Sequence, residues 1–92
     1  MPRLCLYRVH ALQRMLEWGI DFHEIHQVLD TGQLVESYPE DVPYPSRLVC
    51  GRVADRAIHV VAADHDGETI IITTYVPSPA QWDENFTRRR TV

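Results

Sequence analysis

The 92-residue sequence contains no lysine, so all nine of its basic side chains are arginines. Thirteen acidic residues outnumber them and give a formal net charge of −4. Proteins that bind nucleic acid usually carry an overall basic balance, because neutralised phosphates supply much of their affinity. Any phosphate contact must therefore come from local arginine clusters, where the planar guanidinium is well suited to grip a phosphate.

Cysteine is scarce, and long apolar runs are missing. Two cysteines, Cys5 and Cys50, are few for a disulfide scaffold, so we expect both to be free, reduced thiols in a cytoplasmic protein. No apolar run approaches the ~20 residues of a membrane span, and the N-terminus is too short and polar for a secretory signal, so we expect no membrane contact. We also expect a single domain over residues 1–92, because this length has room for one core.

The sequence is rich in β-branched residues between positions 46 and 76, which is typical of three antiparallel strands. The last two, Ala57–Ala63 and Thr69–Val76, are separated by a turn where we predict a three-residue loop with Gly67 in the left-handed conformation. This loop pairs His59 with Thr73. One face of the sheet then carries the core, with Ile58, Val60, Ala62, Ile70, Ile72 and Thr74. The other face is open and carries His59, Val61, Ile71, Thr73 and Tyr75.

Two helices are predicted before this region. The first runs from about Arg8 to Trp18 and ends before Gly19, a residue type common just past a helix end. Its apolar positions at helical spacing are Val9, Leu12 and Leu16, flanked by Ala11 and Met15. The second helix begins after Asp21, a good N-cap, and Glu24 completes the capping-box pattern. It ends at Gly32, and its buried stripe is Ile25, Val28 and Leu29.

These elements predict an α+β fold. The two helices form an N-terminal αα-hairpin that packs on one face of a twisted antiparallel sheet of about four strands. The fourth strand is Gln33–Tyr38, which alternates before a proline-rich loop. Residues Pro2–Leu6 either add an edge strand or simply lead into the first helix.

An ordered series of short motifs resembles one bacterial family, the domain of unknown function 4258. The motifs are His10-Ala11, Arg14-Met15, Trp18-Gly19-Ile20, Gly32, Tyr38-Pro39, Pro45-Ser46, Gly51, His59-Val60-Val61, Ile70 to Tyr75, Trp82 and the terminal arginines. The family in turn resembles the BrnT toxins and, more distantly, the RelE/ParE toxin fold. This resemblance implies a helix-pair-plus-sheet domain partnered with a small antitoxin, in some cases a zinc-finger protein.

Toxins of this type that cleave RNA need a group that moves protons on the ribose 2′-hydroxyl and the leaving oxygen, and cations that stabilise the pentavalent phosphate. They require no metal, and we expect neither a metal nor a cofactor. His59 is the candidate proton carrier, since histidine titrates near pH ~6.5; alternatively, it is a strand histidine bonded to a neighbour. Tyr75 is the candidate to bind a phosphate or stack a base, and otherwise it packs at the sheet edge.

Arg47 is the candidate phosphate clamp, and its direction depends on one turn. A three-residue loop at Ala54–Arg56 projects Arg47 on the same face as His59 and Tyr75. A two-residue loop slips the register by one and turns Arg47 to the core face, where an unpaired guanidinium is costly. We therefore predict the three-residue loop. An ion pair between Arg47 and the acidic loop at Glu40–Asp41 is the alternative role.

Two further groups of basic residues are candidate phosphate contacts. His10 and Arg14 lie four residues apart, on one helical face where a single phosphate can meet both. Alternatively, Arg14 pairs with Glu17 or Glu24 and His10 caps the helix start. The run Arg88, Arg89 and Arg90 forms either a phosphate-binding tail or a solvated end.

The sequence and the resemblance together indicate a toxin-like component of a bacterial type II toxin–antitoxin system, with metal-independent cleavage of mRNA as its candidate activity. The expected partners are RNA and an antitoxin protein. The candidate catalytic residues are Arg47, His59 and Tyr75, with His10, Arg14, Arg88, Arg89 and Arg90 as phosphate contacts. The alternative is a non-catalytic protein-interaction module on the same fold, which the acidic charge, the absence of lysine and Trp18 favour.

Overall fold

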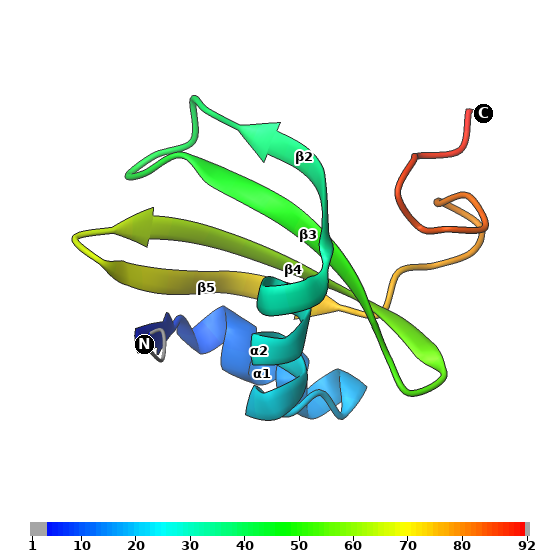
Figure 1. The fold of residues 1–92 in the computed structure, drawn as a ribbon, viewed down its shortest axis with the longest axis horizontal. Helices are drawn as coiled ribbons and strands as arrows, with labels where there is room; N and C mark the ends of the chain where they lie inside the picture. Colours follow the sequence, from blue (N-terminus) through cyan, green and yellow to red (C-terminus); the bar gives the residue numbers. More distant parts are fainter. Residues whose placement is uncertain (1–3, 92) are drawn as a thin grey trace.

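The computed structural model describes residues 4–91, which contain two helices and one five-stranded sheet. The elements follow in the order β1 (Leu4–Tyr7), α1 (Val9–Trp18), α2 (Phe22–Thr31), β2 (Gln33–Tyr38), β3 (Ser46–Val53), β4 (Arg56–His65) and β5 (Glu68–Tyr75). The strand order in the sheet is β1-β5-β4-β3-β2. Both helices lie on one face of the sheet, and the chain after β5 lies away from them (Figure 1).

The predicted fold class is wrong in three respects. The sheet has five strands instead of about four, and it is mixed, because β1 runs parallel to β5 while the other pairs are antiparallel. The helices are not an N-terminal hairpin, since β1 precedes them and each packs mainly on the sheet, α1 on β5 and α2 on β3 and β4. The edge strand that was one of the two alternatives for Pro2–Leu6 forms as β1, although Pro2 lies outside the described residues. Local patterns could not decide between the alternatives, because the partner strand is distant in sequence and Leu4 pairs with Glu68.

Helix α1 packs through a different face from the one that its apolar spacing predicts. Ala11 and Met15 are its buried residues. Val9, Leu12 and Leu16 are instead 70%, 39% and 86% exposed. Successive helical residues point about 100° apart, so either row satisfies the apolar spacing, and the small Ala11 side chain lets the helix lie close to the sheet. Helix α1 therefore has one apolar side toward the sheet and a second toward solvent.

Helix α2 begins and ends where the sequence predicts. Asp21 Oδ1 accepts a hydrogen bond from the Glu24 N–H at 2.8 Å, and Glu24 Oε1 accepts one from the Asp21 N–H at 3.0 Å, which completes the capping box. Its buried residues are Ile25 and Val28. Gly32 follows the last turn, where a Cβ would collide with the carbonyl oxygen of Val28 and lie 2.7 Å from that of Cys50.

The β4–β5 hairpin is confirmed, but its turn is shorter than predicted. The turn residues are Asp66 and Gly67, both at positive φ, so His65 pairs directly with Glu68. Two-residue turns of this kind match the right-handed twist of the strands, and Asp-Gly is a favoured pair for them. The left-handed conformation predicted for Gly67 is confirmed, with a φ of 76°.

A β-bulge in the same hairpin changes which side chains share a face. Ile72 is the extra residue in β5. Beyond it, His59 pairs with Tyr75, whereas the predicted partner was Thr73. Before it, Ile71 is buried in the core, although the sequence placed it on the open face. His59 and Tyr75 therefore share a face as predicted, but through a different register.

The turn between β3 and β4 is also two residues long, so the predicted three-residue loop is wrong. Val53 pairs with Arg56, and the first residue of the Ala54–Asp55 loop has a φ of 56°. Arg47 consequently projects on the helix-bearing face, not on the face of His59 and Tyr75. The guanidinium is paired there, since Arg47 Nη1 lies 2.7 Å from Asp64 Oδ2. The cost expected for this register does not arise, because Asp64 supplies a partner for the guanidinium.

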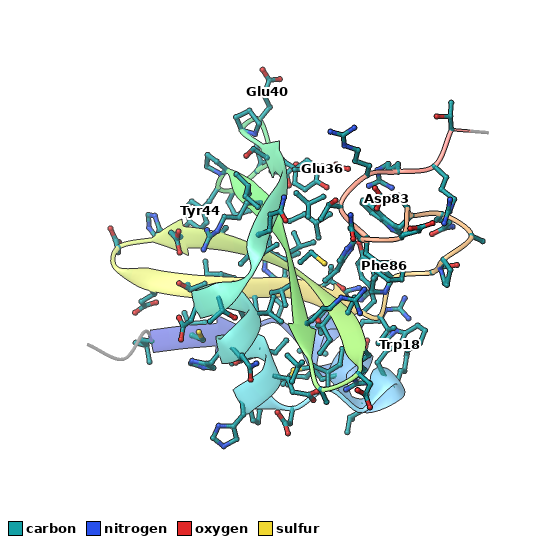
Figure 2. All side chains as sticks on the ribbon, turned by 45° about the vertical axis from the view of Figure 1, so that its right-hand side comes forward. Trp18, Glu36, Glu40, Tyr44, Asp83 and Phe86 are labelled. Carbon is teal, nitrogen blue, oxygen red and sulfur yellow. The ribbon has the colours of Figure 1, made fainter. Side chains whose placement is uncertain are left out.

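The C-terminal segment, residues 77–91, covers the part of the sheet that was expected to be open. Trp82 anchors it at 2% exposure, with its ring centroid 4.6 Å from that of His59. Asp83 Oδ1 accepts hydrogen bonds from the backbone N–H groups of Asn85, Thr87 and Arg88 and folds the segment into a compact turn. Figure 2 shows Asp83 and Phe86 of this segment beside the sheet.

Candidate functional site

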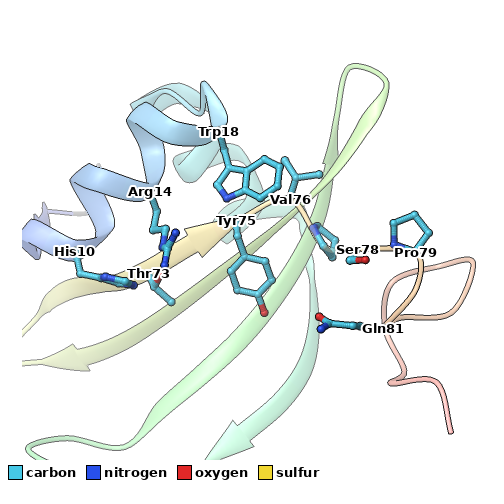
Figure 3. A pocket seen from close by; sticks show the side chains of 10 residues that line it. His10, Arg14, Trp18, Thr73, Tyr75, Val76, Ser78, Pro79 and Gln81 are labelled. Carbon is cyan, nitrogen blue, oxygen red and sulfur yellow. The ribbon is translucent and has the colours of Figure 1, made fainter. Parts of the chain in front are cut away.

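A groove of about 670 Å³ lies between α1, the end of β5 and the start of the C-terminal segment. Charged, polar and aromatic side chains line it together (Figure 3). Those that bear on its chemistry are His10, Arg14, Trp18, Thr73, Tyr75 and Gln81. The groove has the size of an ordinary ligand pocket, about 300–1,000 Å³.

One wall of the groove is a row of side chains from three successive turns of α1. His10, Arg14 and Trp18 lie four residues apart, so they share one side of the helix, spaced by about 6 Å along its axis. The prediction that His10 and Arg14 share a face is therefore confirmed (Figure 3). Arg14 also forms the ion pair weighed as an alternative, with Nη1 at 2.6 Å from Glu17 Oε2.

The floor of the groove connects to a buried histidine through Tyr75. His59 is fully buried, and its Nε2 lies 2.7 Å from the carbonyl oxygen of Phe86. A carbonyl accepts only, so we assign the proton to Nε2, which donates to Phe86. Nδ1 is then an acceptor, and the Tyr75 hydroxyl donates to it at 3.3 Å.

Burial sets the protonation of this pair. Removal from water lowers the pKa of His59 below its usual range, and the same effect raises the pKa of Tyr75. Both side chains are therefore neutral near pH 7. His59 was the candidate proton carrier on an open face, but Trp82 and Phe86 cover it. In the structure, His59 affects the groove only by accepting a hydrogen bond from the Tyr75 hydroxyl. The alternative prediction, a strand histidine bonded to a neighbour, is therefore confirmed.

The burial of His59 leads to an expected pH dependence of stability. The unfolded chain, with a histidine pKa near 6.5, takes up a proton before the folded protein does. The free energy of unfolding therefore decreases on acidification below pH 6.5, by up to about 1.4 kcal/mol per pH unit, and His59 has no effect well above that pH. Urea unfolding between pH 7 and 5 measures this slope. The slope becomes shallower in His59→Gln and is unchanged in His23→Gln, an exposed control; equal slopes in all three proteins would contradict the assignment.

The other predicted contacts are divided between the groove and the rest of the surface. Arg47 lies on the opposite face, paired with Asp64. Of the terminal arginines, Arg89 binds Glu36 Oε1 at 2.9 Å and lies over the Trp82 ring. Arg88 is exposed. Arg90 donates from Nε to the carbonyl oxygen of Pro79 at 2.7 Å, and Pro79 lines the groove, so this guanidinium lies near its rim.

Trp18 was not predicted to belong to this site. The available signal was its spacing, four residues after Arg14. Arg56 holds the helix end that carries it, because Nη1 donates to the Trp18 carbonyl at 2.8 Å and Nη2 to the Gly19 carbonyl at 2.7 Å. Glu24 pairs with the same guanidinium at 3.2 Å. The end of α1 is thus fixed to β4, and from this end the Trp18 side chain lines the groove.

Residues 4–91 contain no group of three or more His, Cys, Asp or Glu side chains that could hold a metal ion. The same part of the chain has no helix that is both long and apolar enough to cross a membrane.

Comparison with curated proteins and with solved structures finds no match to this chain. A family model does match residues 7–76, which is most of the sequence. The matched span runs from the end of β1 to just past β5 and includes the residues that α1 and β5 give to the groove, whereas the C-terminal segment lies outside it. The resemblance seen in the sequence is confirmed at the level of this family: the chain belongs to the family described as domain of unknown function (DUF4258).

Proposed function

We propose that this protein is the toxin of a bacterial type II toxin–antitoxin system and cleaves RNA in the groove beside α1. The observation that carries the proposal is that His10, Arg14 and Tyr75 line one groove. RNA cleavage by protein side chains needs a base, a cation beside the phosphate and an acid for the leaving oxygen, and these three residues can supply them. Compared with the catalytic set expected from the sequence, His10 and Arg14 take the places of His59 and Arg47.

The reaction follows from these roles. His10 takes the proton of the ribose 2′-hydroxyl while that oxygen attacks phosphorus. Arg14 stabilises the negative charge that develops on the phosphate oxygens in the pentavalent transition state. The bond between phosphorus and O5′ then breaks, and the Tyr75 hydroxyl gives its proton to O5′. The products are a 2′,3′-cyclic phosphate and a 5′-hydroxyl, and solvent returns the proton from His10 to the phenolate.

Tyr75 suits the role of proton donor. Burial raises its pKa, so the hydroxyl remains protonated at neutral pH. An alkoxide leaving group is a far stronger base than a phenolate, so the transfer to O5′ is favourable in spite of the raised pKa. The resting hydrogen bond to His59 is long, 3.3 Å, and hence weak, which lets the hydroxyl turn toward a substrate at small cost.

The positive charge at the groove is available to a phosphate even though Arg14 is paired. The Arg14 and Glu17 side chains are 42% and 56% exposed, and ion pairs in water stabilise a protein little. A phosphate can therefore replace Glu17 as partner. Arg90 adds a second guanidinium near the rim. These local charges offset the acidic balance of the whole chain.

The test is cleavage of RNA by the purified protein in the presence of EDTA. We expect fragments that end in a 2′,3′-cyclic phosphate and a 5′-hydroxyl, and no cleavage of DNA of the same sequence, which lacks the 2′-hydroxyl. Expression of this gene without a gene for the antitoxin is expected to stop bacterial growth. RNA that stays intact, together with normal growth, would overturn the proposal.

A second candidate function, protein interaction, is favoured by the solvent-facing apolar row of α1. Leu12 and Leu16 border a hollow of about 350 Å³ together with Phe22 at the start of α2, which is 53% exposed. Contiguous exposed apolar surface usually marks a place where another protein binds. The partner of a toxin is its antitoxin, and we propose that an apolar helix of an antitoxin covers this row. This face lies on α1 apart from the groove residues, so the two functions are compatible.

Leu16→Asp tests this second function. Leu16 is 86% exposed, so the variant should keep the free energy of unfolding within about 0.5 kcal/mol. Its affinity for the protein encoded beside this gene should fall at least tenfold, because the interface would bury an unpaired carboxylate. Isothermal titration calorimetry measures the affinity. Leu34→Asp, at a 56% exposed leucine on β2, is the matched control and should bind normally. Normal binding by Leu16→Asp would remove this function.

A further inference from the structure

Trp18 is the largest apolar side chain on the groove wall, and it is 43% exposed. The other tryptophan, Trp82, is buried and packs on His59, so its role is structural. We propose that Trp18 is the platform on which one nucleobase stacks, so that the groove binds single-stranded RNA. This inference rests on the proposed function and names the form of RNA that the groove accepts.

The backbone that carries Trp18 is held in place. Arg56 hydrogen-bonds to the carbonyl oxygens of Trp18 and Gly19, and Glu24 holds Arg56 from the other side. The end of α1 is therefore fixed before a ligand arrives, and binding has less conformational freedom to remove. Arg56 contacts α1 through backbone oxygens only, so this anchoring does not depend on the side chain at position 18.

The neighbours of Trp18 select a nucleotide as the ligand. Arg14 precedes it by one helical turn, about 6 Å along the axis, and a nucleotide carries its phosphate and its planar base a similar distance apart. An aromatic plane beside a guanidinium is the combination that nucleic-acid-binding grooves use, because every base has a flat face and every unit has a charge. His10 continues the row in the direction of the next unit (Figure 3).

The same arrangement selects a single strand. A base inside a duplex is already stacked and paired, so it can reach an indole only after it leaves the helix. A single strand has bases free to stack. An aromatic groove could also hold a proline-containing peptide, but a peptide gives no reason for Arg14 and His10 to stand in line with Trp18.

The test measures binding without cleavage. A hexanucleotide of 2′-O-methyl RNA cannot be cleaved by the proposed reaction, and a matched oligomer without bases has the same phosphates. We expect the 2′-O-methyl RNA to protect Trp18 from acrylamide quenching at low salt, since Trp82 is already inaccessible. The abasic oligomer should bind about 10-fold to 100-fold more weakly. Equal affinity for the two oligomers would overturn the proposal.

Variants at position 18 complete the test. Trp18→Ala should weaken binding of the base-bearing oligomer by the same factor and leave the affinity for the abasic oligomer unchanged, and Trp18→Phe should recover most of the loss. Phe22→Ala is the matched control, because Phe22 is an exposed aromatic residue that does not line this groove. A duplex that binds as tightly as the single strand, or a proline-rich peptide that protects Trp18 instead, would overturn the proposal.

The failure of this inference is distinguishable from that of the cleavage mechanism. If the wild type cleaves RNA and Trp18→Ala cleaves it with the same KM, the stacking platform is wrong and the nuclease remains. If the wild type binds the 2′-O-methyl oligomer through Trp18 but leaves normal RNA intact, the platform remains and the nuclease is wrong.

Discussion

His10→Ala is expected to lower the rate of RNA cleavage by about 10²-fold to 10⁴-fold, the usual contribution of a side chain that moves a proton in the transition state. His10 is exposed on α1, so alanine, a better helix former, should leave the free energy of unfolding within about 0.5 kcal/mol. The loss should appear in kcat with little change in KM, since the phosphate is held by Arg14. Initial rates on a fluorogenic RNA oligomer across pH 5–9 measure both constants.

The matched control for this variant is His23→Ala, an exposed histidine on α2 that does not line the groove. It should cleave RNA as the wild type does. A His10→Ala enzyme with more than a tenth of the wild-type kcat would show that another group takes the 2′ proton.

Gly32→Ala is expected to cost about 3 kcal/mol or more of the free energy of unfolding, a large part of the stability of a small domain. The added Cβ would collide with the carbonyl oxygen of Val28 and lie 2.7 Å from that of Cys50 and 2.8 Å from Val49 Cγ1. Two of these atoms belong to the backbone and cannot rotate away. The close approach joins the end of α2 to β3, so relief would separate the helix from the sheet. Urea unfolding followed by circular dichroism measures the loss.

Gly19→Ala is the control that distinguishes the free-energy cost of a steric collision from the cost of replacing a glycine. Gly19 has a positive φ of 64° but nothing within 4 Å of an added Cβ. Its substitution should therefore cost only the strain of a left-handed alanine, about 1–2 kcal/mol. The order of the two losses is the informative result. If Gly32→Ala is the milder of the two, the close packing of α2 on β3 does not limit stability.

Short-range signals in the sequence give the correct local structure. The Asp21–Glu24 capping box forms as predicted, Gly19 ends α1 in the left-handed conformation, and Gly67 is left-handed as predicted, although its loop is one residue shorter. Each of these depends on atoms within a few residues of one another, so the pattern contains the whole cause. The same holds for the row of His10 and Arg14, which helical geometry alone places on one side of α1.

Features that depend on distant contacts or on unusual backbone conformations could not be predicted from the sequence. The loop at Ala54–Asp55 has a non-glycine residue at positive φ, for which the sequence carries no signal, and one residue of loop length decides the face of Arg47. The bulge at Ile72 shifts the register of β5 in the same way. Asp64 then pairs with Arg47 across strands, which removes the cost on which the sequence argument rested.

In the candidate site, too, the local features were predicted and the features that depend on distant contacts were not. The prediction that His59 and Tyr75 share a face is confirmed, and Trp82 and Phe86 pack back as the aromatic anchors that the sequence suggests, but the sequence could not indicate that they lie over His59. That contact joins β4 to the irregular C-terminal segment, for which no periodic pattern exists. Of the groove residues on α1, His10 and Arg14 were predicted only as phosphate contacts and Trp18 was not predicted, because the groove depends on how far α1 lies from β5, which local sequence does not determine.

The parallel pairing of β1 with β5 has a consequence for synthesis of the chain. Residues Leu4–Tyr7 leave the ribosome before their partners, Glu68–Ile71, have been made. At about 5–20 residues per second, the interval is on the order of several seconds. During that time β1 has no partner strand, and it can join the sheet only after β5 has been made. The edge strand β1 therefore joins the sheet after the other four strands have been made, although it precedes them in the sequence.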